Sequence, residues 1–397
     1  MTIRKSITTL NGENQGKVKM YAPAEFEEGA SASHWSKEAT PDLLMEPILG
    51  TLDHGDVDLT SAAFEDMGWF LTQQGFSINE GLNDAWVSAS APKQGFFFTV
   101  YPDLGFFFLS WFTFDSELPA GPDDAQFGAF DQRWVTGGAF YSGDSVTVSV
   151  ELTSGGIFDG AVPLAGQTPG YGTITITFIN CNQARLSYNF PSVGLSGEMT
   201  LTRALTDNVA LCQAIQAGNP PTVAQNAEST TPMASTPAAE EPEAPVDGGQ
   251  KPEAEGMINA GMNDAWVTDG APRQGYFFTV YPDFGFFFLS QFTFDSVLPA
   301  GPDDAEFGAF DHRWVTGGGF YSGNSVTVNV ELTSGGIFNG SNPEAGQVLG
   351  YGTITIVFNS CSQATLTYNF PSVGLSGEVT LSRALPDNVS LCQALTP

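Results

Sequence analysis

The sequence predicts a mainly β protein with two tandem antiparallel β-barrel or β-sandwich domains after a short irregular or helical N-terminal segment. Residues 81–216 recur without a gap as residues 261–396, and most of the aligned residues are identical. A repeat of this length is too long for a solenoid unit, and it lies within the usual size range of a domain. Inside each copy, short stretches alternate polar and apolar residues between turns rich in Gly and Asp, which is typical of half-buried strands.

Four regions follow from this repeat. Residues 1–76 form an N-terminal segment in which residues 60–69 are expected to be a short helix. Residues 77–216 and 257–397 are the two β-modules. Residues 217–256 contain no aromatic residue and are rich in Pro, Ala, Ser, Thr and Glu. Such a segment buries too little apolar surface to offset the entropy of ordering, so we expect a disordered linker.

The first module is predicted to contain at least seven short strands, and the second module repeats them. A hairpin with a turn at residues 102–105 is expected between two Phe-rich stretches. The six clearest strand stretches are residues 96–101, 106–114, 145–152, 173–178, 184–188 and 197–203. The short connections fit an antiparallel meander, either closed as a barrel or folded as a sandwich. Only the tail at residues 207–214 is predicted to be helical.

Charge and hydropathy exclude two classes of partner. The chain has 44 acidic and 13 basic residues, which gives a net charge of −31. Nucleic acid is therefore not expected as a partner, because phosphate binding needs clustered Lys and Arg. No apolar stretch reaches the roughly 18 residues of a membrane-spanning helix. The excess of acidic residues is interpreted mainly as a source of solubility.

The cysteines predict one disulfide in each module. Cys181 and Cys212 recur as Cys361 and Cys392, and no two of them have the close spacing of zinc ligands. Disulfides indicate an oxidising compartment, so we expect a secreted protein. The first ten residues lack the apolar core of a signal peptide, and we expect that signal upstream of this chain.

Residues 10–70 resemble the C-terminal end of a leishmanolysin-like (metzincin) zinc metallopeptidase domain, in the version found in secreted bacterial protease-associated-domain proteins. The matching residues are His34 before Trp35, Met45, and the stretch Asp66–Trp69. The resemblance implies that His34 corresponds to the third zinc ligand and Met45 to the Met-turn beneath the metal. It also implies that the full-length parent binds zinc.

The His-Glu-x-x-His helix that carries the other two zinc ligands and the general base of that family is missing. The chain contains only His34, His54 and His312, and no two of them have this spacing. Catalytic zinc needs three protein ligands, so the chain as given is predicted to be inactive and to hold no cofactor.

Both repeats resemble an uncharacterised β-rich module of secreted bacterial proteins, on motifs such as Asn83–Trp86 and Arg133–Trp134. This resemblance implies an extracellular accessory role. Large aromatics are usually buried, but on a β-module they can also bind ligands. Trp111 is replaced by Gln291 in the second copy, and a buried Trp rarely tolerates Gln. We therefore expect Trp111 to be partly exposed and the best ligand contact. The other candidates are Trp86, Trp134, Trp266 and Trp314.

Recurrent Asp residues allow two interpretations. Most are expected to form turns and solvated loops. Calcium ligation is the alternative, because oxygen ligands from loops suit that ion. The candidate ligands are Asp115, Asp123, Asp124, Asp295, Asp303 and Asp304. An enzyme that uses paired carboxylates of the repeats is the least favoured hypothesis.

Together these observations predict the non-catalytic C-terminal portion of a secreted zinc metallopeptidase-like protein. Its two accessory β-modules would bind or target an unknown extracellular ligand, either a protein or a glycan. The alternative is a stand-alone extracellular adhesive or glycan-binding protein.

Overall fold

A computed structural model describes Tyr21, His34 and residues 75–118, 125–221, 258–298 and 305–396. Residues 75–397 form one compact unit that contains both repeats. Within the described residues, each repeat folds as a closed barrel of eight antiparallel strands. The predicted mainly β fold is therefore confirmed, and the barrel is the correct choice over the sandwich. The helix expected at residues 60–69 lies outside the described residues.

The first barrel is a meander in which each strand pairs with the next and β8 closes on β1. Its strands are β1 (Asp84–Val87), β2 (Gly95–Tyr101), β3 (Phe106–Phe114), β4 (Gln132–Phe140), β5 (Ser145–Ser154), β6 (Gly166–Asn180), β7 (Gln183–Phe190) and β8 (Leu195–Arg203). The expected hairpin turn is confirmed. A 3-10 turn at Pro102–Leu104 ends at Gly105, which has a left-handed φ of 61°.

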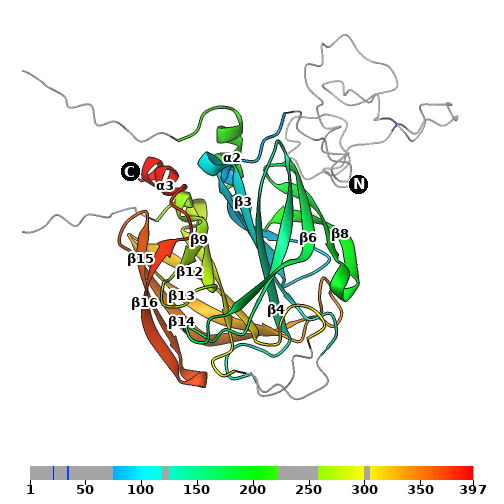
Figure 1. Cartoon of the computed structure of the whole chain (residues 1–397). Coiled ribbons are helices and arrows are strands. Elements are labelled where there is room, and N and C mark those ends of the chain that lie inside the picture. Colours follow the sequence, from blue (N-terminus) through cyan, green and yellow to red (C-terminus); the bar gives the residue numbers. More distant parts are fainter. Residues whose placement is uncertain are drawn as a thin grey trace, which may run out of the picture. The chain divides into compact units, whose positions relative to one another are not determined.

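The second barrel repeats this order and closes between β16 and β9. Its strands are β9 (Asp264–Val267), β10 (Gly275–Tyr281), β11 (Phe286–Phe294), β12 (His312–Ser322), β13 (Ser325–Ser334), β14 (Gly346–Phe358), β15 (Gln363–Phe370) and β16 (Leu375–Arg383). Figure 1 shows the first barrel, in cyan to green, beside the second, in yellow to red.

Alternation along the strands explains the barrel interiors. In β5, Val146, Val148 and Val150 are buried while the residues between them are more exposed. Successive side chains of a strand point to opposite faces, so one face of β5 lines the core and the other meets solvent. The alternation of polar and apolar residues that predicted this strand therefore matches the alternation of its exposed and buried side chains.

Strands β2 and β3 do not alternate, because both of their faces are covered. Every residue of β2 is buried, and so is every residue of β3 except its first and third. One face fills the barrel and the other packs against the second barrel. A strand buried on both faces has a nearly continuous apolar sequence. The Phe-rich runs of β2, β3, β10 and β11 therefore mark the strands at the contact between the barrels.

The contact between the barrels is an aromatic core with approximate two-fold symmetry. The rings of Phe97 and Phe277 stack at its centre, with centroids 5.3 Å apart. The indole N–H of Trp134 donates to the carbonyl of Thr293 at 2.9 Å, and that of Trp314 donates to the carbonyl of Thr113 at the same distance. These reciprocal bonds join equivalent positions of the two repeats.

Each barrel is completed by two aromatic residues of the other repeat, which we call the plug residues. Phe307 and Phe338 lie in the core of the first barrel, and Phe127 and Phe158 lie in the core of the second. The Phe307 ring is 5.1 Å from that of Phe190, centroid to centroid. Because the plugs are exchanged, neither barrel core is complete without the other repeat.

Asp115 and its equivalent Asp295 hold the plugs in place. The Asp115 carboxylate accepts a hydrogen bond from the Phe307 N–H at 2.9 Å, and its backbone carbonyl accepts one from the Phe338 N–H at 2.8 Å. Its other carboxylate oxygen lies 2.7 Å from Arg133. Asp295 makes the same contacts with Phe127, Phe158 and Arg313.

A short helix follows each barrel and is tied to it by a disulfide. The helices are α2 (Val209–Gln216) and α3 (Val389–Leu395), which confirms the predicted helical tail. Cys181 bonds to Cys212, and Cys361 bonds to Cys392, as expected from the sequence. At Gly81 a Cβ would lie 2.4 Å from the Cα of Cys212, so the helix packs directly on this glycine.

Candidate functional site

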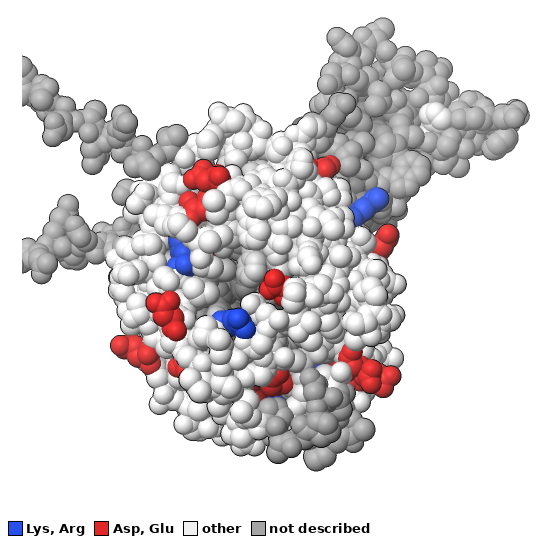
Figure 2. Space-filling model, in the orientation of Figure 1, with Lys and Arg blue, Asp and Glu red and all other residues white. Residues whose placement is uncertain are grey.

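A cavity of about 180 Å³ lies where the two barrels meet. Figure 2 shows this region as a hollow near the middle of the drawn face, with acidic and basic side chains near its rim. The first barrel contributes Phe108, Trp134, Thr136, Glu151, Thr153 and Gln167. The second contributes Ala265, Trp266, Val267, Arg273, Gln274, Gly275, Tyr276, Phe277, Phe292 and Ala384. The site is therefore composite, and neither repeat forms it alone.

Strand register explains why these residues of the first barrel share one wall. Thr136 of β4 pairs with Glu151 of β5, and Thr153 of β5 pairs with Gln167 of β6. Paired residues point to the same face of a sheet. That face is the outside of the barrel, because the alternate residues Val148 and Val150 fill its interior. The outer face of β3 to β6 thus forms one wall of the cavity.

Most of the wall is apolar, and its charged groups come from opposite barrels. The Oε2 atom of Glu151 accepts a hydrogen bond from the Gln167 amide at 3.1 Å. Arg273 donates from one terminal nitrogen to the carbonyl of Ala165. A carboxylate and a guanidinium can thus both take part in binding.

A buried histidine, His312, packs against the Trp134 ring at the cavity. The His312 ring stacks on the Trp134 ring with centroids 4.4 Å apart. Its Nδ1 accepts a hydrogen bond from the backbone N–H of Trp134 at 3.2 Å, and its Nε2–H donates to the carbonyl of Thr153. Burial lowers the pKa of His312 to about 3, although the Thr153 carbonyl opposes the shift; Arg133 and Arg313 lower it further. The ring is therefore neutral at physiological pH.

Gln132 occupies the equivalent position of the first repeat and makes the same bonds. Its Oε1 accepts a hydrogen bond from the backbone N–H of Trp314 at 3.2 Å, and its Nε2 donates to the carbonyl of Thr333 at 2.9 Å. A neutral His that carries its proton on Nε2 offers the same acceptor and donor as Gln. The exchange between the two repeats therefore leaves the surroundings unchanged.

The half of the contact related to the cavity by the approximate two-fold axis differs from it in the position of one ring. At Gly95 a Cβ would lie 3.0 Å from Cζ of Phe112, because that ring covers the glycine. At both glycines the nearest atom is a Trp carbonyl oxygen at 2.8 Å, but at Gly275 the next neighbour is Cγ1 of Val267 at 3.4 Å rather than a Phe ring. The Phe292 ring thus leaves the space over Gly275 that Phe112 fills over Gly95. Lys93 replaces Arg273 and donates to the carbonyl of Ala345 at 2.6 Å.

The expectation that Trp111 is partly exposed is wrong. Its side chain is 1% exposed and lies inside the first barrel, with its ring centroid 4.8 Å from that of the plug residue Phe338. The second barrel accepts Gln291 because its amide finds a partner in the Tyr276 hydroxyl. The inference from Trp to Gln missed that the neighbouring position also changes, from Phe96 to Tyr276.

The other four candidate tryptophans are also buried. Trp86 and Trp266 lie in the two barrel cores, and Trp134 and Trp314 lie in the core between the barrels. Only two of these four are part of the cavity wall described above, Trp134 and Trp266. Trp134 and Trp266 were thus candidates as exposed ligand contacts, whereas in the structure they are buried residues that line the cavity.

The carboxylates of Asp115 and Asp295 are engaged by Arg133 and Arg313 and by backbone N–H groups of the plug segments. The remaining calcium candidates, Asp123, Asp124, Asp303 and Asp304, lie outside the described residues, as does Met45. His34 is described, and its carbonyl accepts from the Tyr21 N–H at 2.8 Å. Among the described residues, no three His, Cys, Asp or Glu side chains are grouped to hold a metal ion.

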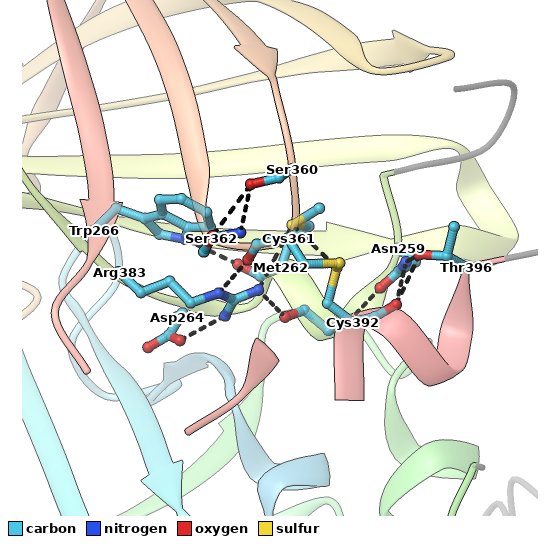
Figure 3. Close-up of a disulfide and its surroundings, with 11 residues drawn as sticks. Asn259, Met262, Asp264, Trp266, Ser360, Cys361, Ser362, Arg383, Cys392 and Thr396 are labelled. Atoms are coloured by element: carbon cyan, nitrogen blue, oxygen red, sulfur yellow. Dashed lines mark hydrogen bonds and ion pairs between the residues drawn. A yellow bond between two sulfur atoms is a disulfide. The ribbon is translucent and has the colours of Figure 1, made fainter. Parts of the chain in front are cut away.

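A buried ion pair links each disulfide to the contact between the barrels, as Figure 3 shows for the second repeat. Arg383 lies 2.6 Å from Asp264, donates to the carbonyls of Cys361 and Gly261, and stacks over Trp266. Burial raises the pKa of Asp264 even though Arg383 opposes the shift. Across the contact, the Tyr101 hydroxyl donates to Asp264 at 3.0 Å. These groups are held in a structural network.

Comparison with known proteins adds no relationship: no protein-family model and no curated protein matches the chain. None of the described helices is long and apolar enough to cross a membrane.

The cavity residues Thr136, Gln167 and Arg273 were not identified from the sequence. The signal that could have located the site was the loss of alternation in the Phe-rich strands, which indicates a second buried face. Two lining positions differ between the halves, Arg273 for Lys93 and Tyr276 for Phe96, but neither difference predicts which half Phe112 fills.

Proposed function

We propose that the two barrels together are one non-catalytic binding module and that its ligand occupies the cavity between them. The observation that carries this proposal is the composite wall, to which both repeats contribute a charged group beside aromatic rings. Concave sites with aromatic walls and a few polar groups are typical of ligand binding. The duplication then serves to build one site from two halves.

The setting that we propose is extracellular. Two disulfides support an oxidising compartment, because such bonds are rare in the cytosol. We further propose that the chain is the C-terminal portion of a secreted zinc metallopeptidase-like protein, on the resemblance of residues 10–70. Zinc analysis of the purified chain tests this part. Tight one-to-one zinc, or proteolysis that a chelator abolishes, would contradict a non-catalytic chain.

Binding is tested with the full chain on arrays of extracellular peptides and glycans. Ala384 lines the cavity and is exposed, so Ala384→Trp should block the site without disturbing a core. Ala204 is the exposed equivalent in the half of the contact related by the approximate two-fold axis, and Ala204→Trp is the matched control. The proposal expects ligands whose signal is lost in Ala384→Trp and kept in Ala204→Trp. Signals that both variants keep would place binding elsewhere.

A further inference from the structure

We infer that the cavity binds one apolar side chain of an extended peptide, and that each chain binds a single such ligand. This inference rests on the proposed function and names the ligand class for the same site.

The size and walls of the cavity favour a single apolar side chain. A cavity of about 180 Å³ is smaller than the roughly 300–1,000 Å³ of sites that bind whole small molecules. The lining residues Phe108, Trp134, Phe277 and Phe292 border this space and belong to, or pack against, the aromatic core between the barrels. Water in such a space makes few hydrogen bonds, so its replacement by an aromatic or branched aliphatic group is favourable.

The polar groups at the cavity suit the backbone of a peptide. One carboxylate oxygen of Glu151 is bonded to Gln167, and the other makes no hydrogen bond to a described residue. Arg273 uses one nitrogen on the Ala165 carbonyl, which leaves further guanidinium N–H groups without a described partner. A peptide offers an N–H donor and a C=O acceptor beside every side chain. Glu151 can accept from the first, and Arg273 can donate to the second.

The same inventory disfavours a sugar ring. A pyranose carries several hydroxyls, and burial of each without a partner is unfavourable. Gln274 is already engaged, because it donates to the carbonyls of Ile157 and Gly160 and accepts from the Thr293 hydroxyl. Glu151, Arg273 and the hydroxyls of Thr136 and Thr153 remain in the lining, which is a small set for the several hydroxyls of a buried ring.

Among the described residues, the two halves of the contact differ in the ring that lies beside this space. A Cβ at Gly95 would lie 3.0 Å from Cζ of Phe112, whereas the equivalent Phe292 is not among the three nearest neighbours of a Cβ at Gly275. The two rings meet near the pseudo-two-fold axis, with centroids 6.3 Å apart. The near-identical repeats therefore give one site rather than two.

The test uses the full chain and short capped glycine peptides that carry one central Phe, Leu, Asp or Gly. Calorimetry and ligand-observed NMR would measure affinity and stoichiometry, beside a panel of mono- and oligosaccharides. We expect the Phe and Leu peptides to bind with one ligand per chain and the Asp and Gly peptides to bind at least about tenfold more weakly. Ala384→Trp should weaken Phe-peptide binding about tenfold or more, and Ala204→Trp should leave it unchanged.

A second pair of variants keeps the test decisive if Ala384→Trp does not fold. Glu151→Gln should weaken peptide binding several-fold, whereas Glu331→Gln, its equivalent in the second repeat, should not. Sugar binding that Ala384→Trp or Glu151→Gln abolishes would overturn the peptide assignment and leave the proposed function intact. Two peptides per chain, or equal effects of the paired variants, would overturn the single site. If neither peptides nor sugars bind, both the inference and the proposed function fail.

Discussion

Inside the second barrel, the amide of Gln291 donates a hydrogen bond to the Tyr276 hydroxyl at 3.2 Å. The same two positions of the first barrel hold Trp111 and Phe96, whose ring centroids are 4.7 Å apart. A pair of packed rings in one repeat is thus exchanged for a polar pair in the other. The two substitutions compensate each other, so both Trp111 and Gln291 are buried at this position.

This exchange predicts strong coupling between the two positions. Tyr276→Phe should lower the free energy of unfolding by about 1–3 kcal/mol, because it leaves the buried Gln291 amide without its partner. Gln291→Trp alone should also destabilise, because the larger ring must share its space with the Tyr276 hydroxyl. The double variant, which restores the pair of the first barrel, should be more stable than the sum of the single effects. Urea denaturation measures all four proteins, and simple additivity would argue against the coupling.

Asp115 is expected to be among the most sensitive positions of the protein. Asp115→Ala removes the partner of buried Arg133 and the acceptor for the Phe307 N–H. Breaking a buried ion pair costs about 3–5 kcal/mol, because the remaining charge is uncompensated. Asp269 is exposed, and Asp269→Ala should change stability by less than about 0.5 kcal/mol. A small effect of Asp115→Ala would show that the plugs do not depend on this anchor.

His312 should make the protein less stable in acid than its His312→Gln variant. The unfolded His takes up a proton near pH 6.5, whereas the folded one stays neutral down to a pKa of about 3. Between these values the unfolded chain binds more protons, so the free energy of unfolding falls as the pH falls. The difference between wild type and His312→Gln should change by about 1.4 kcal/mol per pH unit over this window.

Denaturant titrations at several pH values between about 7 and 4 measure this difference. Gln132→His is the matched control, because it places a second imidazole in the equivalent site and should add a second dependence of the same sign. Parallel pH profiles for wild type and His312→Gln would contradict a neutral buried ring.

Each disulfide should stabilise its helix and the network beside it. The two cysteines of a pair are 31 positions apart, and closing a loop of that length in the unfolded chain is worth about 3–4 kcal/mol in the chain-entropy view. Replacement of Cys361 and Cys392 by Ala should lower the melting temperature, as should the matching change at Cys181 and Cys212. Calorimetry in the absence of reductant compares the two variants. An unchanged melting temperature would contradict this role.

The sequence was sufficient for the antiparallel β class of each repeat, left barrel and sandwich as alternatives, and was insufficient for the assembly of the two repeats. Alternation along β5 and the turn at Pro102–Leu104 are local features, and they identified strands and connections directly. The exchange of Phe127 and Phe307 between barrels is a long-range feature that no spacing in the chain encodes. The site was missed for the same reason, because its walls come from opposite repeats.

The burial of tryptophans shows the same limit. The exchange of Trp111 for Gln291 indicates exposure only if the neighbouring residues are unchanged, whereas the burial of Trp111 depends on Phe96 and on Phe338 of the other repeat. The exposure of Trp111 cannot be inferred from Gln291 alone, because the neighbouring Phe96 also changes, to Tyr276.

The central claim is that the two repeats complete each other through the exchanged plugs. A protease site introduced between residues 221 and 258 allows the chain to be cut after folding. Size-exclusion chromatography and calorimetry of the cut protein should show both fragments in one species that unfolds in a single transition. Two fragments that separate without denaturant, each still folded, would contradict the account.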